Sequence, residues 1–275
     1  SKGRLKECRK VLQKIEPENT VNDLIGQMEV EIEKDRNSAV GWRYLMQPWL
    51  RTPLMIAVCI MFFQQFVGIN TVIYYSPKIF LMAGFESTLS AIWASVGIGI
   101  VNVVFTVISL YLVDRIGRRK LYFIGLSGIA FSVLCLSACF IYANQLGEIG
   151  RWLMVIFMFG YVAFFAISIG PLGWLVISEI FPQKVRGLGT SIGSLAVWIF
   201  NCIVSFTFFK IIDFFSIPGT EIVVGQTTSE NPAGAFFLYG FIAVLGLVWG
   251  YLFLPETKGL SLEEIEQKWR KNREC

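Results

Sequence analysis

The sequence predicts an all-α protein that crosses a membrane several times. Of its 275 residues, 55% are hydrophobic and only 16% are charged, which excludes an ordinary water-soluble domain. Six runs contain no charged residue, and each exceeds the roughly 20 residues that a helix needs to span a bilayer. These runs cover residues 52–77, 87–113, 121–147, 152–178, 187–209 and 231–255.

Basic residues gather on one side of this six-span arrangement. Of the 24 Lys and Arg, 10 precede residue 52, 4 lie between spans two and three, 2 lie between spans four and five, and 5 follow residue 255. Only Lys78, Arg151 and Lys210 lie on the opposite side. By the positive-inside rule we expect both termini in the cytoplasm. The net charge of +4 then follows from topology and requires no nucleic-acid partner.

We divide the chain into a cytoplasmic helical segment (1–52), a six-helix membrane bundle (53–254) and a cytoplasmic tail helix (255–275). Apolar residues at helical spacing predict two short amphipathic helices in the first segment. Ser261 and Glu264 form a capping box for the tail helix. The chain opens at Ser1 without methionine, so we expect it to be a fragment or a processed form.

Catalytic and metal-binding chemistry has little support in the sequence. The chain has no histidine, which removes the commonest general base. Four of the six cysteines lie in apolar runs, where a thiol behaves as a small hydrophobic group. We therefore expect no metal site and no cofactor, and we do not expect an enzyme.

Span one contains the most informative stretch, which runs from Gln64 to Asn70 and holds three amides. Each buried amide costs several kcal/mol in hydrocarbon unless it is partnered. The amides either bond neighbouring helices or line a polar cavity, and we favour the cavity. On a straight helix Gln64 and Gly68 share a face that Asn70 does not, but a local break at Gly68 would bring Asn70 round. Two tyrosines, Tyr74 and Tyr75, follow as interface aromatics or as a lid on the cavity.

Span two carries small and polar residues along one face, of which only Asn102 has the reach to suggest ligand contact. A very short turn follows, from Asp114 to Arg119, and it includes Arg118. The acidic residue before the basic ones suggests an ion-pair latch, although basic residues at such a turn also satisfy the positive-inside rule. Span three has no strongly polar residue, so we expect a supporting role.

Span four is interrupted by Gly170, Pro171 and Gly173, and Trp174 follows at once. Proline and glycine weaken the hydrogen-bond ladder, and broken helices in a membrane usually line a cavity or form a hinge. Trp174 is either an interfacial residue or part of that cavity. Glu179 ends the span and Arg186 lies in the turn after it.

Span five aligns Trp198 and Asn201 on one polar face, and span six is an ordinary apolar helix. The connection 217–232 between them is predicted to be a loop because it is rich in Gly, Thr, Ser and Pro.

The two unusual spans, one and four, are the first members of two triplets that cross the membrane in opposite directions. Interrupted spans at corresponding positions of an inverted repeat indicate a transporter's binding site near the midplane. The residues we assign to this site are Gln64, Gln65, Asn70, Asn102, Trp174, Trp198 and Asn201. Amides suit hydroxyl groups and an indole can stack on a sugar ring, so the expected ligand is a small neutral sugar or polyol.

The motifs resemble those of the sugar porters of the major facilitator superfamily, in their C-terminal six-helix half. The resemblance covers nearly the whole chain, through QQFVGIN, GIVN, DRIGRR, GPLGW with SEIFPQKVRG, and PETKG in order. It implies that Trp198 lines the site and that Tyr74 and Tyr75 belong to an outer gate. The residues that it implies contact sugar are Gln64, Gln65, Asn70, Asn102 and Trp174. It also implies a cytoplasmic ion-pair network that locks the outward-open state, formed by Asp114, Arg118, Arg119, Glu179 and Arg186.

Two departures from the family pattern affect the expected function. Some proton-coupled members have glutamine beside the Trp198 position, where this chain has Val197. The family has twelve spans, so the expected partners include an N-terminal six-helix half as well as the lipid bilayer.

We expect transport of a monosaccharide or polyol by alternating access, as uniport or proton symport, in a plasma membrane or a bacterial inner membrane. A non-transporting sugar sensor on the same fold is the alternative.

Overall fold

The computed structural model describes residues 21, 25–26, 45–85, 87–216, 222–224, 227–259 and 264. The chain divides into two units, Ser1–Met46 and Gln47–Cys275, and all six candidate membrane spans belong to the second. Apart from a few isolated positions, the predicted amphipathic helices of the first segment and the predicted tail helix lie outside the described residues.

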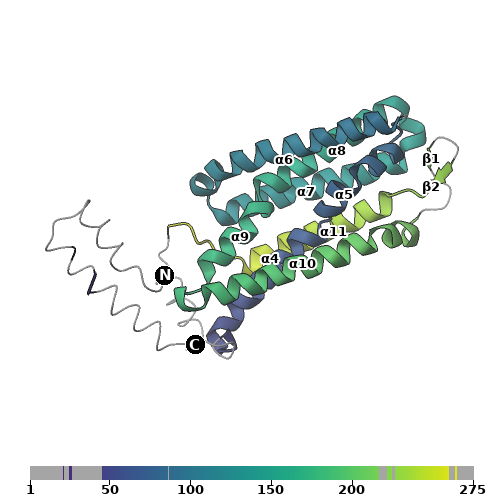
Figure 1. Cartoon of the computed structure of the whole chain (residues 1–275). Helices are drawn as coiled ribbons and strands as arrows, with labels where there is room; N and C mark the ends of the chain where they lie inside the picture. The colour runs from purple at the N-terminus through teal and green to yellow at the C-terminus, as the bar shows by residue number, and fades with distance from the viewer. Residues whose placement is uncertain are drawn as a thin grey trace. The chain divides into compact units, whose positions relative to one another are not determined.

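The second unit is a bundle of six spans, two of which are each built from two helices (Figure 1). The 3-10 turn η1 (Pro48–Leu50) leads into α4 (Arg51–Phe66), which is followed by α5 (Ile69–Met82), α6 (Thr88–Ile116) and α7 (Arg118–Ile141). The second triplet consists of α8 (Ala143–Ile167) with α9 (Ile169–Ile180), then α10 (Gln183–Phe214) and α11 (Ala233–Phe253). The prediction of an all-α membrane protein is confirmed.

A small hairpin interrupts the helical pattern between α10 and α11. Strand β1 (Ile222–Val224) pairs antiparallel with β2 (Thr227–Ser229), where the sequence had predicted only a loop. Short strands of this kind bury little surface, so composition alone does not reveal them.

The most extensive packing in the bundle joins helices of the first triplet to helices of the second. Helix α7 lies along α8 and α11, α4 lies against α10, and α6 packs on α8. Glycines let α11 approach α7 closely, because a Cβ at Gly250 would lie 2.4 Å from the ring of Tyr122. Helix α7 thus packs against both α8 and α11.

Candidate substrate-binding site

The first helix break lies at Gly68, where the sequence predicted one. Helix α4 ends at Phe66 and α5 begins at Ile69, and Gly68 has a φ of 87°, in the left-handed region that favours glycine. A Cβ at this position would lie 2.3 Å from Cε2 of Tyr239, so packing also requires glycine.

Two backbone carbonyls at this break accept hydrogen bonds from side chains, and the carbonyl of Gly68 also accepts from the backbone N–H of Val72 at 3.3 Å. The hydroxyl of Tyr161 donates to the carbonyl of Val67 at 2.9 Å, and the hydroxyl of Thr71 donates to that of Gly68 at 2.7 Å. Nothing in the sequence distinguishes Tyr161 or Tyr239, because a tyrosine inside an apolar run looks like any other core aromatic. Tyr161 satisfies a backbone carbonyl at the break, and Tyr239 packs against Gly68.

The second break lies at Ser168, with φ −127° and ψ −102°, and not at Gly170–Gly173 as predicted. Gly170 and Pro171 lie in the first turn of α9, where proline is tolerated. Proline cannot donate to the carbonyl four residues earlier, so the helix is interrupted upstream of it. That carbonyl, of Ile167, accepts a 2.8 Å hydrogen bond from the hydroxyl of Ser109 on α6.

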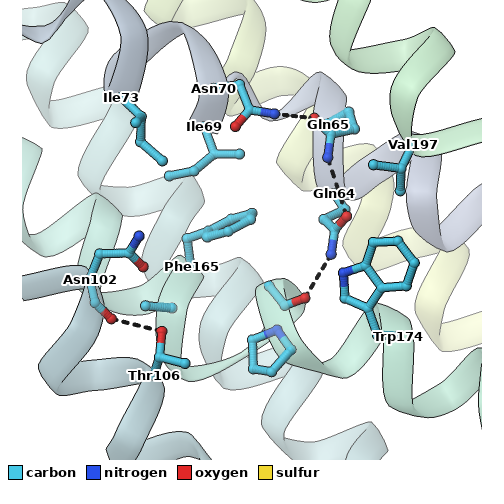
Figure 2. A pocket seen from close by; sticks show the side chains of 13 residues that line it. Gln64, Gln65, Ile69, Asn70, Ile73, Asn102, Thr106, Phe165, Trp174 and Val197 are labelled. Atoms are coloured by element: carbon cyan, nitrogen blue, oxygen red, sulfur yellow. Dashed lines mark hydrogen bonds between the residues drawn. The ribbon is translucent and has the colours of Figure 1, made fainter. Parts of the chain in front are cut away.

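Three amide side chains connect the two breaks in a single chain of hydrogen bonds, which we call the amide relay (Figure 2). Asn70 Nδ2 donates to Gln65 Oε1 at 2.6 Å, and Gln65 Nε2 donates to Gln64 Oε1 at 3.3 Å. Gln64 Nε2 donates to the carbonyls of Ile169 and Gly170 at 3.1 and 2.7 Å. The break at Gly68 therefore brings Asn70 to the other amides, as the sequence predicted.

A pocket of about 300 Å³ lies beside the relay. Five of the seven residues expected to bind substrate line it, namely Gln64, Gln65, Asn70, Asn102 and Trp174. Its other lining residues are Ile69, Ile73, Thr106, Phe165, Ala166, Gly170, Pro171 and Val197. Helical spacing could have indicated Thr106, which lies one turn after Asn102, but nothing in the sequence distinguishes Phe165 from other core aromatics.

The pocket combines neutral hydrogen-bonding groups with flat apolar surfaces. None of its lining residues carries a charge. Figure 2 shows Gln64 and Gln65 on one wall, Asn102 across from them with the ring of Phe165 between, and the indole of Trp174 beside Gln64. Within the described residues, no three His, Cys, Asp or Glu side chains come together as metal ligands. Such a lining suits an uncharged ligand with several hydroxyl groups and an apolar face.

Trp198 and Asn201 were expected in the site but do not line the pocket. Trp198 is 67% exposed, whereas its neighbour Val197 is 7% exposed and faces the pocket. Consecutive residues of a helix point about 100° apart, so α10 can present only one of the two there. Asn201 is buried and donates a 3.3 Å hydrogen bond to the hydroxyl of Tyr74.

The expected gate residues divide between two places. Tyr74 and Tyr75 lie on α5 and contact α10, where the Tyr75 hydroxyl donates to the carbonyl of Ser205 at 3.3 Å. Gly170 and Pro171 line the pocket itself. Gly173 does not line the pocket, and a Cβ there would be 3.0 Å from Nε2 of Gln64.

An ion-pair cluster forms at the turn between α6 and α7. Arg118 Nη2 lies 2.8 Å from Glu179 Oε1, and both side chains are largely buried at 12% and 21% exposure. Asp114 also pairs with Arg118 at 3.3 Å, but it is 76% exposed, so this second pair contributes little. The structure thus brings together Asp114, Arg118 and Glu179 of the expected network.

The other two members of the expected network are placed differently. Arg119 donates to the carbonyl of Tyr251 at 2.7 Å, and its only bond to a carboxylate among the described residues is through its backbone N–H. Arg186 forms no ion pair in the described part of the chain, and its buried Nε and Nη2 have no hydrogen-bond partner there. Within the described residues neither side chain pairs with a carboxylate, and the place of Arg119 and Arg186 in the network stays a prediction.

Residues after α11 complete this cluster, and no sequence pattern indicated that they would. The carboxylate of Glu256 accepts from the backbone N–H groups of Arg118 and Arg119 at 3.1 and 3.2 Å, which caps the N-terminus of α7. Thr257 donates to Glu179 at 2.5 Å. Lys258 donates to the carbonyl of Arg115, at the C-terminal end of α6. The segment after α11 is thereby fastened to both ends of the turn.

The sequence of this chain is similar to those of known transport proteins. Residues 1–269 match the family described as "Sugar (and other) transporter". The D-xylose-proton symporter of Escherichia coli (strain K12) is 33% identical over 269 residues, which are 98% of this chain and 51% of the symporter. The glucose transporter GlcP of Staphylococcus epidermidis is 38% identical over 229 residues, which are 83% of this chain and 47% of GlcP.

Solved structures agree with the sequence matches. A structure of the proton:xylose symporter XylE bound to 6-bromo-6-deoxy-D-glucose has a TM-score of 0.71 at 31% identity. The match covers 97% of this chain and 52% of that one. The chain therefore spans about half the length of the relatives it matches.

Proposed function

Because the chain belongs to the sugar porter family of the major facilitator superfamily, whose members are membrane transporters and not enzymes, we propose that it is the C-terminal half of a sugar transporter. In this proposal the half carries part of a central site for a monosaccharide or polyol. The complete protein exposes that site to each side of the membrane in turn.

The observation that carries the proposal is the uncharged pocket at the two helix breaks. Gln65 and Asn70 keep unused hydrogen-bonding capacity beside it, and Trp174 offers an indole at its wall. Amides can bond several hydroxyl groups at once, while an indole covers the apolar face of a pyranose. A charged ligand would find no counter-ion among the lining residues.

An N-terminal six-helix half is the partner that this proposal requires. Helix α6 buries only Ala91, Ile98 and Ser109 within this chain, although it is a full membrane span. Its exposed apolar side chains need either lipid or another helix layer against them. Within the described residues Nε and Nη2 of Arg186 have no hydrogen-bond partner, which is consistent with a carboxylate supplied by that other half.

We place the protein in the plasma membrane, or in the inner membrane of a bacterium, with both termini of this chain in the cytoplasm. The support is the distribution of basic residues, because 21 of the 24 Lys and Arg lie on the proposed cytoplasmic side. In this orientation the ion-pair cluster at the α6–α7 turn is cytoplasmic and holds the outward-open state.

The test is uptake of labelled monosaccharides and polyols by the complete transporter in liposomes, with and without a pH gradient. Saturable uptake that an unlabelled sugar inhibits is the expected result, and a response to the gradient would assign proton symport. Sugar binding without flux would identify a sensor, and absence of both would refute the proposal.

A further inference from the structure

The C-terminal half of α5 is joined to α10 by contacts between side chains. Asn201 Nδ2 donates to the hydroxyl of Tyr74 at 3.3 Å, and the hydroxyl of Tyr75 donates to the carbonyl of Ser205 at 3.3 Å. The ring of Tyr75 also stacks on that of Phe208, with the ring centroids 5.4 Å apart and the planes 6° apart. In the proposed orientation this half of α5 lies on the outer side of the membrane.

Lys78 adds a cation–π contact to this junction. Its Nζ lies 4.0 Å from the centroid of the Phe209 ring, and Tyr75 makes a T-shaped contact with the same ring at a centroid distance of 4.8 Å. A cation above an aromatic face is attracted by the ring quadrupole. In the described part of the chain Lys78 forms no ion pair, so this ring is the partner that the structure gives to its charge.

Pro77 weakens α5 directly before Lys78. Proline has no N–H to donate to the carbonyl of Ile73, four residues earlier, and that carbonyl accepts a 3.3 Å hydrogen bond from the hydroxyl of Ser76. A proline inside a helix is a common site of bending. The end of α5, from Lys78 to Met82, can therefore tilt relative to the part of the helix before Pro77.

The junction between α5 and α10 is small enough to open. Helix α5 packs more extensively along α6 than against α10. Tyr74 and Lys78 are both exposed, so these contacts lie at the edge of the junction. Water can solvate the ammonium group of Lys78 once it leaves the ring, so separation does not leave a buried charge without a partner.

We propose that Lys78 and Phe209 form an outer latch, which holds α5 on α10 while the pocket is open to the outside. This inference rests on the proposed function. Helix α5 carries Ile69 and Ile73 of the pocket lining, so a movement of α5 alters the pocket. The latch is formed in the same structure as the cytoplasmic ion-pair cluster, which belongs to the outward-open state in our proposal. When the outer side closes, α5 moves away from α10 and Lys78 leaves the ring.

Thiol labelling of the complete transporter without sugar tests the latch. In a protein whose native cysteines are replaced, Thr106→Cys places one thiol in the pocket on α6, which is not part of the latch. An uncharged, membrane-impermeant maleimide is added to either side of sealed vesicles of uniform orientation. The ratio of the outside rate to the inside rate does not depend on the amount of folded protein. Lys78→Gln should lower this ratio about threefold, the scale of an exposed cation–π contact. An unchanged or raised ratio would overturn the proposal.

Two further variants distinguish a cation–π contact from general packing. Lys78→Arg keeps a cation above the ring and should retain the wild-type ratio, whereas Phe209→Leu removes the ring and should lower the ratio as Lys78→Gln does. Lys78→Gln and Phe209→Leu combined should lower it no further than either alone, because both remove the same contact. A full second effect in the double variant would mean that Lys78 does not act through Phe209, and the latch would be wrong.

Lys210→Gln is the matched control. Lys210 follows Phe209 on α10 and is also exposed, but no ion pair or cation–π contact joins its side chain to another described residue. Its substitution should leave the ratio unchanged. A decrease as large as that in Lys78→Gln would mean that surface charge sets the ratio, and it would overturn the latch.

Because the labelling uses no sugar, its outcome is separate from that of the transport assay. Sugar uptake by the wild-type protein, with an unchanged labelling ratio in Lys78→Gln, would refute the latch alone. A lowered ratio in a protein that neither binds nor takes up sugar would refute the proposed function alone.

Discussion

The hydroxyl of Tyr161 donates a 2.9 Å hydrogen bond to the carbonyl of Val67, at the point where α4 ends. Both residues are fully buried, so the carbonyl has no access to water. We predict that Tyr161→Phe lowers the free energy of unfolding by about 1–3 kcal/mol, the cost of a buried carbonyl left without a partner. Because the break also places Asn70, sugar affinity should fall as well.

Tyr122→Phe is the control for this prediction. Tyr122 is equally buried and donates to the carbonyl of Gly246 at 2.9 Å, but it joins α7 to α11 away from the break. Thermal unfolding in detergent should shift similarly in both variants, while only Tyr161→Phe weakens sugar binding. Equal effects of the two substitutions on binding would show that the bond at the break has no specific role.

The second prediction concerns the backbone of the same break. Gly68→Ala should destabilise the protein by about 2 kcal/mol or more, because a left-handed φ and the ring of Tyr239 both oppose a Cβ. Adding Tyr239→Leu removes the steric clash but not the backbone strain, so the double variant should regain only part of the lost stability. Gly99→Ala on α6 is the control, since a Cβ there meets nothing within 4 Å. A melting temperature unchanged by Gly68→Ala would contradict the structure at this position.

The sequence predicted this break and the amide cluster because both depend on local chemistry. Three amides in a membrane span require partners, and the glycine among them marks where the helix can bend. The sequence predicts the second break a few residues too late in the chain. The sequence shows which residue cannot donate, Pro171, but the interruption occurs at Ser168, upstream of the carbonyl that loses its partner.

What the sequence could not supply is the rotation of α10 and the contacts between distant segments. A helical face can be found from spacing, but its direction in the bundle depends on packing, so Val197 occupies the place expected for Trp198. Glu256 caps α7 from 138 residues away in the sequence, a distance at which no local pattern applies. The unexpected members of the site and of the ion-pair cluster are therefore those fixed by tertiary structure.

The third prediction separates the two tryptophans. Trp174→Ala and Gln65→Ala should each weaken sugar binding by more than about 1 kcal/mol, the scale of one stacking contact or hydrogen bond. Trp198→Ala should have little effect, because Trp198 is 67% exposed and outside the pocket. Equilibrium binding of a labelled sugar to purified transporter gives all three values. Wild-type affinity in both site variants would refute the assignment of the pocket.

The fourth prediction concerns the ion pair between Arg118 and Glu179. In Glu179→Gln the largely buried guanidinium loses its charged partner, and the cluster that holds the α6–α7 turn against α9 is weakened. The inward-open population should rise, and cysteines introduced at the cytoplasmic mouth should react faster with a thiol reagent. Asp114→Asn should change the rate little, because Asp114 is exposed. Unchanged labelling in Glu179→Gln would exclude a latch.

The last prediction is that the 275-residue chain alone does not transport sugar. This chain supplies the amide and aromatic residues that line the pocket. In the proposed transporter the N-terminal half supplies the rest of the cavity wall. Alone, the chain would leave this polar surface against lipid or another copy, which is unfavourable.

Proton coupling by the chain alone is also not expected. None of the residues that line the pocket is ionisable, and a proton relay through hydrocarbon requires a titrating group. Reconstituted in liposomes, the chain should show no saturable sugar uptake at any pH, and co-reconstitution with the N-terminal six helices should restore it. Saturable uptake by the chain alone would instead mean that two copies assemble into a working transporter, each supplying half of the cavity.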